Sequence, residues 1–358
     1  MWEDSGYAYA KASWIIGKSW LGNRISSLSS LHTLSELDRL VFPDNYHELP
    51  GRELLPSLEK RIIRRAVRQI LSVVNSYTSP PKLLVRMLKG FEYSDLKECL
   101  AHIAGGKSDI PVICDIGRFK TVRFNAYPDA GAMIKKTEFE SLLSDDLKSI
   151  KPGMDLTAID AKLDHRFYQG LIESLSQLDE DDRETASRII ADEISIRNCF
   201  WALRLQTYYQ KSEAETGKYL MDLKMPSFFR QNKTSLSHEA RQSLDFPLDF
   251  RANWSGWRWE KFLNNEEPSV HWTADPRHFQ NAASQYLYHL SYHGFHSSPM
   301  SVSAIFCFIK LKQFEEDLLT SVAEGLALGI NSADVFKLLA LPAKFPAGSF
   351  AVNTAEGN

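Results

Sequence analysis

The chain has 358 residues, of which 44% are hydrophobic and 24% are charged, and its formal net charge is −3 at pH 7. This length exceeds that of a typical single domain, and the apolar content suffices for more than one core, so we expect a globular protein of two or three subdomains. The near balance of positive and negative charge gives no electrostatic reason to expect a nucleic-acid partner.

Targeting signals and cysteine usage point to an intracellular protein. The first residues after Met1 include Glu3 and Asp4, where a secretory signal would have a basic start and then an apolar run. The longest apolar run near the end, Ala304–Ile309, is far shorter than the ~20 residues that span a bilayer. The four cysteines form no CxxC pair, which is typical of reduced core thiols rather than of disulfides. We expect a cytoplasmic protein with no membrane span of its own.

Helical periodicity runs through most of the chain. Apolar residues at a spacing of three and four, bounded by glycine and proline breakers, predict helices over residues 7–30 (interrupted at Gly17 and Gly22), 56–76, 83–103, 156–178, 181–209, 275–292 and 301–328. The segment 110–129 is rich in β-branched residues between two prolines, and it predicts either a short extended excursion or a loop. Helices resume near residue 137. The pattern predicts an all-α protein.

A short helical phrase returns at the same phase in these helices. It reads Asp95–Leu100 in one helix, Ser195–Phe200 in another and, more loosely, Asp317–Val322 in a third. In the first two copies the apolar positions follow the i, i+3, i+4, i+7 spacing of one buried stripe: Leu96, Cys99, Leu100 and Ile103, then Ile196, Cys199, Phe200 and Leu203. Packing alone explains these residues, so we expect a repeated structural unit rather than a functional site.

The phrase divides the chain into repeated units. With insertions assigned to loops, we expect a first unit over residues 1–112, a second over 113–217, a third over 218–340 and a C-terminal tail over 341–358. Units of this kind cannot bury their apolar faces alone, so they stack on one another. Such an array favours a scaffold over an enzyme with one central pocket.

Two polar motifs have only a superficial likeness to ligand sites. Gly17-Lys18-Ser19 has the closing letters of a phosphate-binding loop, but Ala12 replaces its first glycine and bulky residues follow, so we expect a helix that tolerates Gly17. His289, His293 and His296 share one helical face, as zinc ligands can. The surrounding tyrosines and the absence of an adjacent glutamate favour an aromatic packing face instead. A metal-dependent enzyme that uses these histidines stays one hypothesis for the function.

A tryptophan-rich segment between residues 246 and 272 is the strongest candidate for partner binding. Its aromatic rings alternate with arginines, a pattern that suits stacking on the bases of single-stranded nucleic acid. Nearby acidic residues reduce the positive charge that such binding needs. An inter-unit connection or a protein interface is therefore favoured, because tryptophan and arginine are the preferred anchors of such interfaces. The residues concerned are Trp254, Trp257, Trp259, Trp272, Arg251 and Arg258. No G-x-S-x-G motif or paired carboxylate frame is present, so we expect no catalytic, cofactor-binding or metal-binding residues and no cofactor.

With three phrase-bearing units in order, the sequence resembles the C subunit of bacterial and archaeal A/V-type rotary ATPases, the counterpart of subunit d in the eukaryotic vacuolar enzyme. Four segments carry the resemblance: Tyr7–Ala12 is similar to the family's Y-x-Y-A-x-A, Tyr93–Lys97 to D-Y-x-N-L-K, Ile194–Leu205 to I-x-N-I-R…L-R-x-K, and Ile309–Leu318 to Y-I-x-x-K-E-x-E-x-x-N-L. The sequence departs from the family at Asp95, Ser195 and Asp317, where asparagine is common.

The resemblance implies three similar helical units arranged as a funnel about a pseudo-threefold axis. It implies a non-catalytic central-stalk subunit that caps the membrane proteolipid ring, receives the lower end of the central axle, and works in proton or sodium transport at the cytoplasmic face. Its partners would be the axle subunits and the proteolipid ring, and no residue would perform chemistry. The alternative from another class is a soluble helical-repeat adaptor that binds another protein through the tryptophan-rich segment.

Overall fold

The computed structural model describes residues 2–21, 24–147, 150–229, 234–266 and 270–339. Within these ranges every regular element is a helix, which confirms the predicted all-α class. The long helices are α1 (Trp2–Gly17), α4 (Gly51–Val74), α5 (Lys82–Ala104), α8 (Thr157–Leu175), α9 (Glu180–Tyr209), α12 (Pro276–Ser297) and α13 (Val302–Ala327). The short ones are α2 (Ile25–Leu28), α3 (Leu34–Val41), α6 (Ala130–Ile134), α7 (Glu140–Leu147), α10 (Glu213–Thr216), α11 (His238–Leu244) and α14 (Ser332–Leu338).

Local sequence chemistry sets where these helices begin. Ser301 caps α13 by accepting a hydrogen bond from the backbone N–H of Ala304 at 3.0 Å. Asp275 caps α12 in the same way from Arg277, and Pro276 occupies the first helical turn, where its missing N–H costs nothing. These caps account for the predicted starts near residues 275 and 301.

The first predicted helix is wrong in its extent. Residues 7–30 do not form one interrupted helix, because α1 ends at Gly17 and α2 begins at Ile25. The chain turns at Lys18 and Ser19, whose backbone N–H groups bond back to the last turn of α1. The segment 110–129 contains only short 3-10 turns, which confirms the loop alternative, and the sequence missed α6 just beyond it.

Four apolar clusters form the core, and the three phrase-bearing helices share a common relation to them. The N-terminal halves of α5, α9 and α13 all lie in one central cluster, through residues such as Leu88, Ile190 and Ile309. Their C-terminal halves separate into three peripheral clusters. Each peripheral cluster contains one copy of the phrase, through Leu96 and Cys99, Ile196 and Cys199, or Leu318 and Val322. The repeated phrase is thus a repeated packing element.

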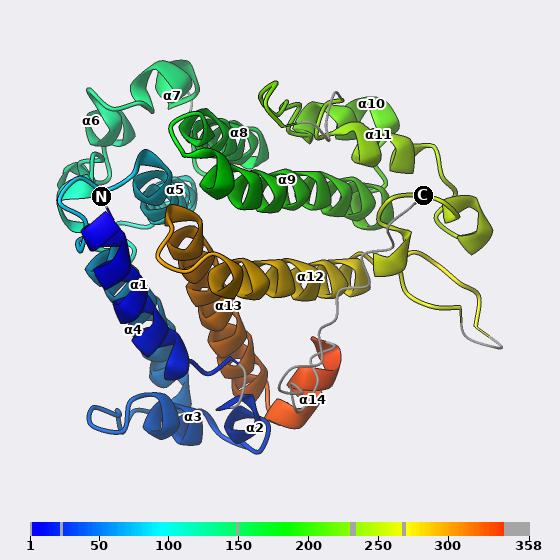
Figure 1. Cartoon of the computed structure of the whole chain (residues 1–358). Helices are drawn as coiled ribbons and strands as arrows, with labels where there is room; N and C mark the ends of the chain where they lie inside the picture. Colours follow the sequence, from blue (N-terminus) through cyan, green and yellow to red (C-terminus); the bar gives the residue numbers. More distant parts are fainter. Residues whose placement is uncertain (1, 22–23, 148–149, 230–233, 267–269, 340–358) are drawn as a thin grey trace.

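Figure 1 shows the different directions in which the long helices run. α9 and α12 run side by side toward the tryptophan-rich segment and α11, whereas α1, α4 and α13 run toward the end where α2, α3 and α14 gather. α5 packs against α8, with α6 and α7 beside them. The boundaries at residues 112 and 217 and the threefold arrangement stay predictions, and the tail 341–358 lies outside the described residues.

Buried polar side chains on α5 attach the neighbouring loop to this helix. The Glu92 carboxylate accepts hydrogen bonds from the backbone N–H of Val122, at 2.6 Å, and from the hydroxyl of Thr121. One turn later Asp95 accepts from the backbone N–H of Cys114 at 2.9 Å. The backbone N–H groups of the loop lose their hydrogen bonds to water when they become buried. The carboxylates of Glu92 and Asp95 accept these hydrogen bonds in place of water.

The other two phrase-bearing helices hold their loops in a related way. On α9 the Asn198 side chain accepts from the backbone N–H of Met221 at 2.8 Å and donates to two backbone carbonyls. On α13 the Glu315 carboxylate accepts from the backbone N–H of Trp20 at 2.7 Å. The polar positions beside the apolar phrase therefore fix long connections to the helices.

Candidate functional site

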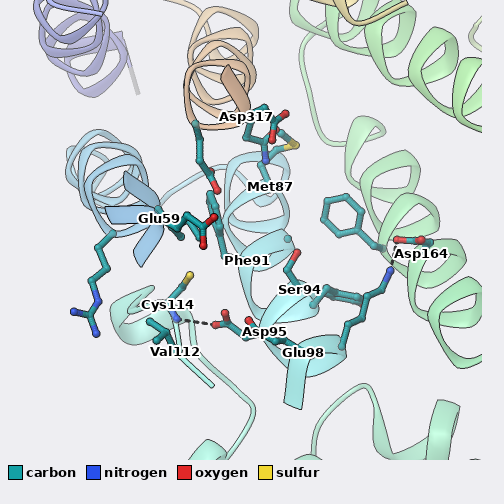
Figure 2. Close-up of a pocket in the computed structure, with 18 of the residues that line it drawn as sticks. Glu59, Met87, Phe91, Ser94, Asp95, Glu98, Val112, Cys114, Asp164 and Asp317 are labelled. Atoms are coloured by element: carbon teal, nitrogen blue, oxygen red, sulfur yellow. Dashed lines mark hydrogen bonds and ion pairs between the residues drawn. The ribbon is translucent and has the colours of Figure 1, made fainter. Parts of the chain in front are cut away.

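A cavity of about 670 Å³ lies where helices from distant parts of the chain converge. Its walls come from α4, α5, α8, α9 and α13, with the loop before Cys114 on one side and part of α12 on another. Figure 2 shows side chains from several of these helices pointing into the same space. The cavity therefore adjoins the ends of the shared core rather than any single peripheral cluster.

The helical period explains why these side chains meet. On α5, Met87, Phe91, Ser94 and Glu98 recur at intervals of three and four residues, so they form one face. The phrase residues Leu96 and Cys99 lie on the opposite side, in the peripheral cluster. The same period on α13 brings Lys310, Gln313, Phe314 and Asp317 to the wall, and on α9 it brings Ile189, Glu193 and Arg197.

Ion pairs connect different helices across the cavity wall. The Lys310 ammonium of α13 lies 2.6 Å from the Glu193 carboxylate of α9, which also accepts a hydrogen bond from the Tyr168 hydroxyl of α8 at 2.9 Å. The Lys97 ammonium of α5 lies 2.8 Å from the Asp164 carboxylate of α8. Arg197 of α9 contacts the other oxygen of the same carboxylate at 3.2 Å. These partly buried contacts hold four helices in a fixed relation.

Several acids on the wall have raised pKa values. Burial raises the pKa of Asp95 to about 7, although the Cys114 N–H opposes this shift. Burial also raises the pKa of Glu316 to about 7 and that of Asp317 to about 6. Glu59 of α4 has a raised pKa because of burial and the nearby Glu324. The cavity can thus present negative charge that varies near neutral pH.

The structure places His289, His293 and His296 on one helix, where two of them pack against tyrosine rings. α12 continues through Gly294 to Ser297, so the three lie on one helix as expected. His289 packs against Tyr288, and His296 packs against Tyr292 with ring centroids 4.6 Å apart. Burial lowers the pKa of His289 and of His296. Among the residues that the structure describes, no group of three His, Cys, Asp or Glu side chains could hold a metal ion. The aromatic packing interpretation is favoured, and His293 gains no ligand role.

The four tryptophans of the tryptophan-rich segment are core residues and do not form a surface for a partner. Trp254, Trp257, Trp259 and Trp272 are all buried, and each indole N–H donates a hydrogen bond within the protein at 3.0 or 3.1 Å. Trp259, for example, donates to the Ser195 hydroxyl of the second phrase. The adaptor hypothesis was wrong in its binding surface, because alternating aromatic and charged residues in sequence do not reveal which rings face inward.

The two arginines of this segment pair with acids of the same region. Arg251 lies 3.2 Å from Glu260, and Arg258 lies 2.5 Å from Asp192 of α9. Their charges therefore join the segment to itself and to α9. This accounts for the acids that the sequence places beside them.

The apparent phosphate-loop motif also belongs to the helical framework. Gly17 ends α1, and the Lys18 ammonium lies 3.8 Å from the centre of the Trp14 ring. A phosphate loop follows a strand, whereas this segment follows a helix. The predicted helix is confirmed in place of a phosphate loop, but it ends at Gly17 rather than continuing through it.

Sequence reasoning missed the cavity itself. Many of its wall residues are polar positions opposite the apolar stripes of helices that are far apart in the chain, such as Glu59, Asp164 and Glu193. Each looks like an ordinary solvated residue in its own helix. A signal in the sequence that could have indicated the cavity is the set of charged residues on the faces opposite the apolar stripes of the three phrase-bearing helices.

Fold and site define an all-α scaffold protein with a polar cavity between its long helices. The family model for the ATP synthase (C/AC39) subunit matches residues 32–335, so the chain belongs to this family of A/V-type ATPase subunits. A similar chain is an uncharacterized protein of Treponema pallidum (strain Nichols), 26% identical over 325 residues that cover 90% of this chain and 92% of that one.

Membership confirms the family resemblance drawn from the sequence, and three of its four segments lie within the matched residues, whereas Tyr7–Ala12 lies before them. It makes the chain a subunit of a V/A-type ATPase, and it agrees with the expectation that the chain is not itself an enzyme, because the family is a non-catalytic stalk subunit of the complex. In the described part of the chain, no helix combines the length and the apolar character needed to cross a membrane.

Proposed function

We propose that this protein is a central-stalk subunit of a rotary ATPase and that its central cavity is the socket for the end of the axle. In this role it couples the axle to the proteolipid ring at the cytoplasmic face of the membrane, for proton or sodium transport. The observation that carries the proposal is the position of the cavity, where all three phrase-bearing helices contribute wall residues.

A socket that transmits torque has to resist shear between its walls. The shared apolar cluster joins α5, α9 and α13 at their N-terminal halves, and close-packed interiors deform little under load. The pairs Lys310–Glu193 and Lys97–Asp164 then join these helices and α8 beside the cavity. Rigid walls of this kind suit a mechanical role better than substrate turnover.

The proposed arrangement is a funnel of three units, over residues 1–112, 113–217 and 218–340, about a pseudo-threefold axis through the cavity. The common course of the three phrase-bearing helices, from a shared core into separate peripheral clusters, supports it. The cavity then lies on the axis, where a rotating axle would end.

Site-specific crosslinking tests the socket directly. Ser94 lines the cavity and is exposed, so Ser94→Cys can carry a thiol-reactive photocrosslinker with Cys114→Ser as background. In the assembled membrane complex we expect crosslinks from this position to one axle subunit. Asp44→Cys, on the exposed loop after α3, serves as the matched control. An assembled complex in which only the control position crosslinks to the axle would refute the socket.

A further inference from the structure

The cavity wall has an uneven distribution of charge. Three of its five lysine and arginine side chains, Lys97, Arg197 and Lys310, form ion pairs with Asp164 and Glu193 and leave the other acids of the wall unpaired by them. The side formed by α4, α5 and α13 therefore keeps an excess of acids within the described residues.

Figure 2 shows the geometry of this acidic side. Glu59 comes from α4, Asp95 and Glu98 come from α5 and Asp317 comes from α13, and all four line the same cavity as Phe91. Phe91 is 8% exposed, and Met87 lies next to it in the wall. We call the carboxylates of Glu59, Asp95, Glu98, Glu316 and Asp317 the acidic wall.

Apolar residues next to carboxylates, as in this wall, favour one kind of side chain. Lysine and arginine have an aliphatic stem that packs on apolar surface and a cationic head that pairs with carboxylates. Phe314, which is partly exposed in the wall, is an aromatic ring on which a cation can also pack. Two exposed cations of α4, Lys60 and Arg64, also border the cavity, but the five carboxylates of the acidic wall outnumber them.

Enclosure makes the acidic wall unfavourable when nothing occupies it. Burial disfavours the ionised forms of these carboxylates and raises the pKa values of Asp95, Glu316 and Asp317, and the neighbouring carboxylates Glu98 and Asp317 add to the shifts of Asp95 and Glu316 respectively. A cationic group that enters the cavity removes the cost and gains charge-assisted hydrogen bonds. An anionic or purely apolar group gains neither.

We propose that the cavity selects cationic side chains, so that the subunit it receives presents lysine or arginine to the acidic wall. This inference rests on the proposed socket function and deepens it, because it states the chemistry of the partner's contacting end.

The electrostatic part is tested on the free full-length protein. The thiol of Ser94→Cys, in the Cys114→Ser background, is treated in turn with a cationic and an anionic methanethiosulfonate. The rate with the cationic reagent is divided by the rate with the anionic one. This ratio is then divided by the same ratio measured for a small free thiol. Clefts lined by one sign of charge enrich counter-ions by ~10-fold or more, so we expect a normalised ratio of about 10 in favour of the cationic reagent. A second thiol at Asn75→Cys, on the exposed end of α4, provides the reference site.

Neutralising the wall should remove this preference. Glu316→Gln with Asp317→Asn leaves the packed core untouched, since Asp317 faces the cavity and is exposed to it. We expect the ratio at Ser94→Cys to fall severalfold, while the exposed-loop substitution Asp44→Asn leaves it unchanged. A normalised ratio near one in the parent, or an equal ratio in parent and neutralised variant, would overturn the inference.

The identity of the partner groups is tested in the assembled complex. A water-soluble carbodiimide joins carboxylates to amines in direct contact, so we expect peptides that contain Glu316 or Asp317 to be joined to lysines of the occupying subunit. The neutralised variant should lose these products and release the occupant at lower salt. If the photocrosslink from Ser94→Cys identifies an occupant but the neutralised variant holds it equally well at every salt concentration, cation selectivity is refuted and the socket stands. If no occupant crosslinks at all, the socket itself is refuted.

Discussion

Asp95 offers a quantitative test of the electrostatics of the cavity. It is 4% exposed, and burial raises its pKa from 3.8 to about 7. Its ionised form is therefore destabilised in the folded chain by up to about 4 kcal/mol, at ~1.36 kcal/mol per pH unit. Between about pH 4 and pH 7 the folded chain keeps a proton that the unfolded chain releases, so this carboxyl lowers stability progressively as pH rises through that range.

Asp95→Asn should remove the contribution of Asp95 to the pH dependence of stability while keeping the loop contact. The amide oxygen can still accept the hydrogen bond from the Cys114 N–H, which measures 2.9 Å here. Because the amide carries no charge, we expect the variant to gain about 2 kcal/mol relative to the parent between pH 5 and pH 8. Urea unfolding followed by tryptophan fluorescence at each pH gives the difference, with Asp44→Asn on an exposed loop as control. A difference between parent and variant that is the same at pH 5 and pH 8 would refute the reasoning.

Two further predictions concern packing. Trp254 is fully buried in the peripheral cluster of α9, so Trp254→Ala should destabilise the fold by about 3–5 kcal/mol, whereas Trp14→Ala on the outer face of α1, 63% exposed, should change it by less than ~1 kcal/mol. Equal shifts in the urea midpoint would contradict this assignment. A Cβ on Gly170 would lie 2.2 Å from the Arg86 side chain, whereas nothing lies within 4 Å of one on Gly17. We expect Gly170→Ala to cost about 2–3 kcal/mol and Gly17→Ala to be close to neutral, as thermal unfolding would show.

The sequence predicted the parts of the fold that depend on local pattern. The apolar stripes at Leu96 and Cys99 and at Ile196 and Cys199 lie in separate clusters, as a repeat requires. Helix starts with clear N-caps, such as Asp275, were predicted to within a residue, whereas the end of the same helix lies at Ser297 and not at residue 292. Local rules failed in the first helix, where the turn after Gly17 depends on tertiary contacts such as the bond from Trp20 to Glu315.

The candidate site could not be predicted because it depends on long-range convergence. Glu59, Asp164 and Asp317 are far apart in sequence and each occupies a helix face that reads as solvated. Conversely, the tryptophan cluster looked like a binding surface until Trp259 was found bonded to Ser195 in the core. Residue type and spacing give the period of a helix, but they do not tell which helices will share a space.

The central claim is tested most directly by isolating the tagged protein from gently solubilised native membranes and identifying by mass spectrometry the chains that accompany it. The account predicts that axle and proteolipid-ring subunits are recovered in near-stoichiometric amounts. Recovery of this chain without either of them, from membranes in which the ATPase itself stays intact, would contradict it.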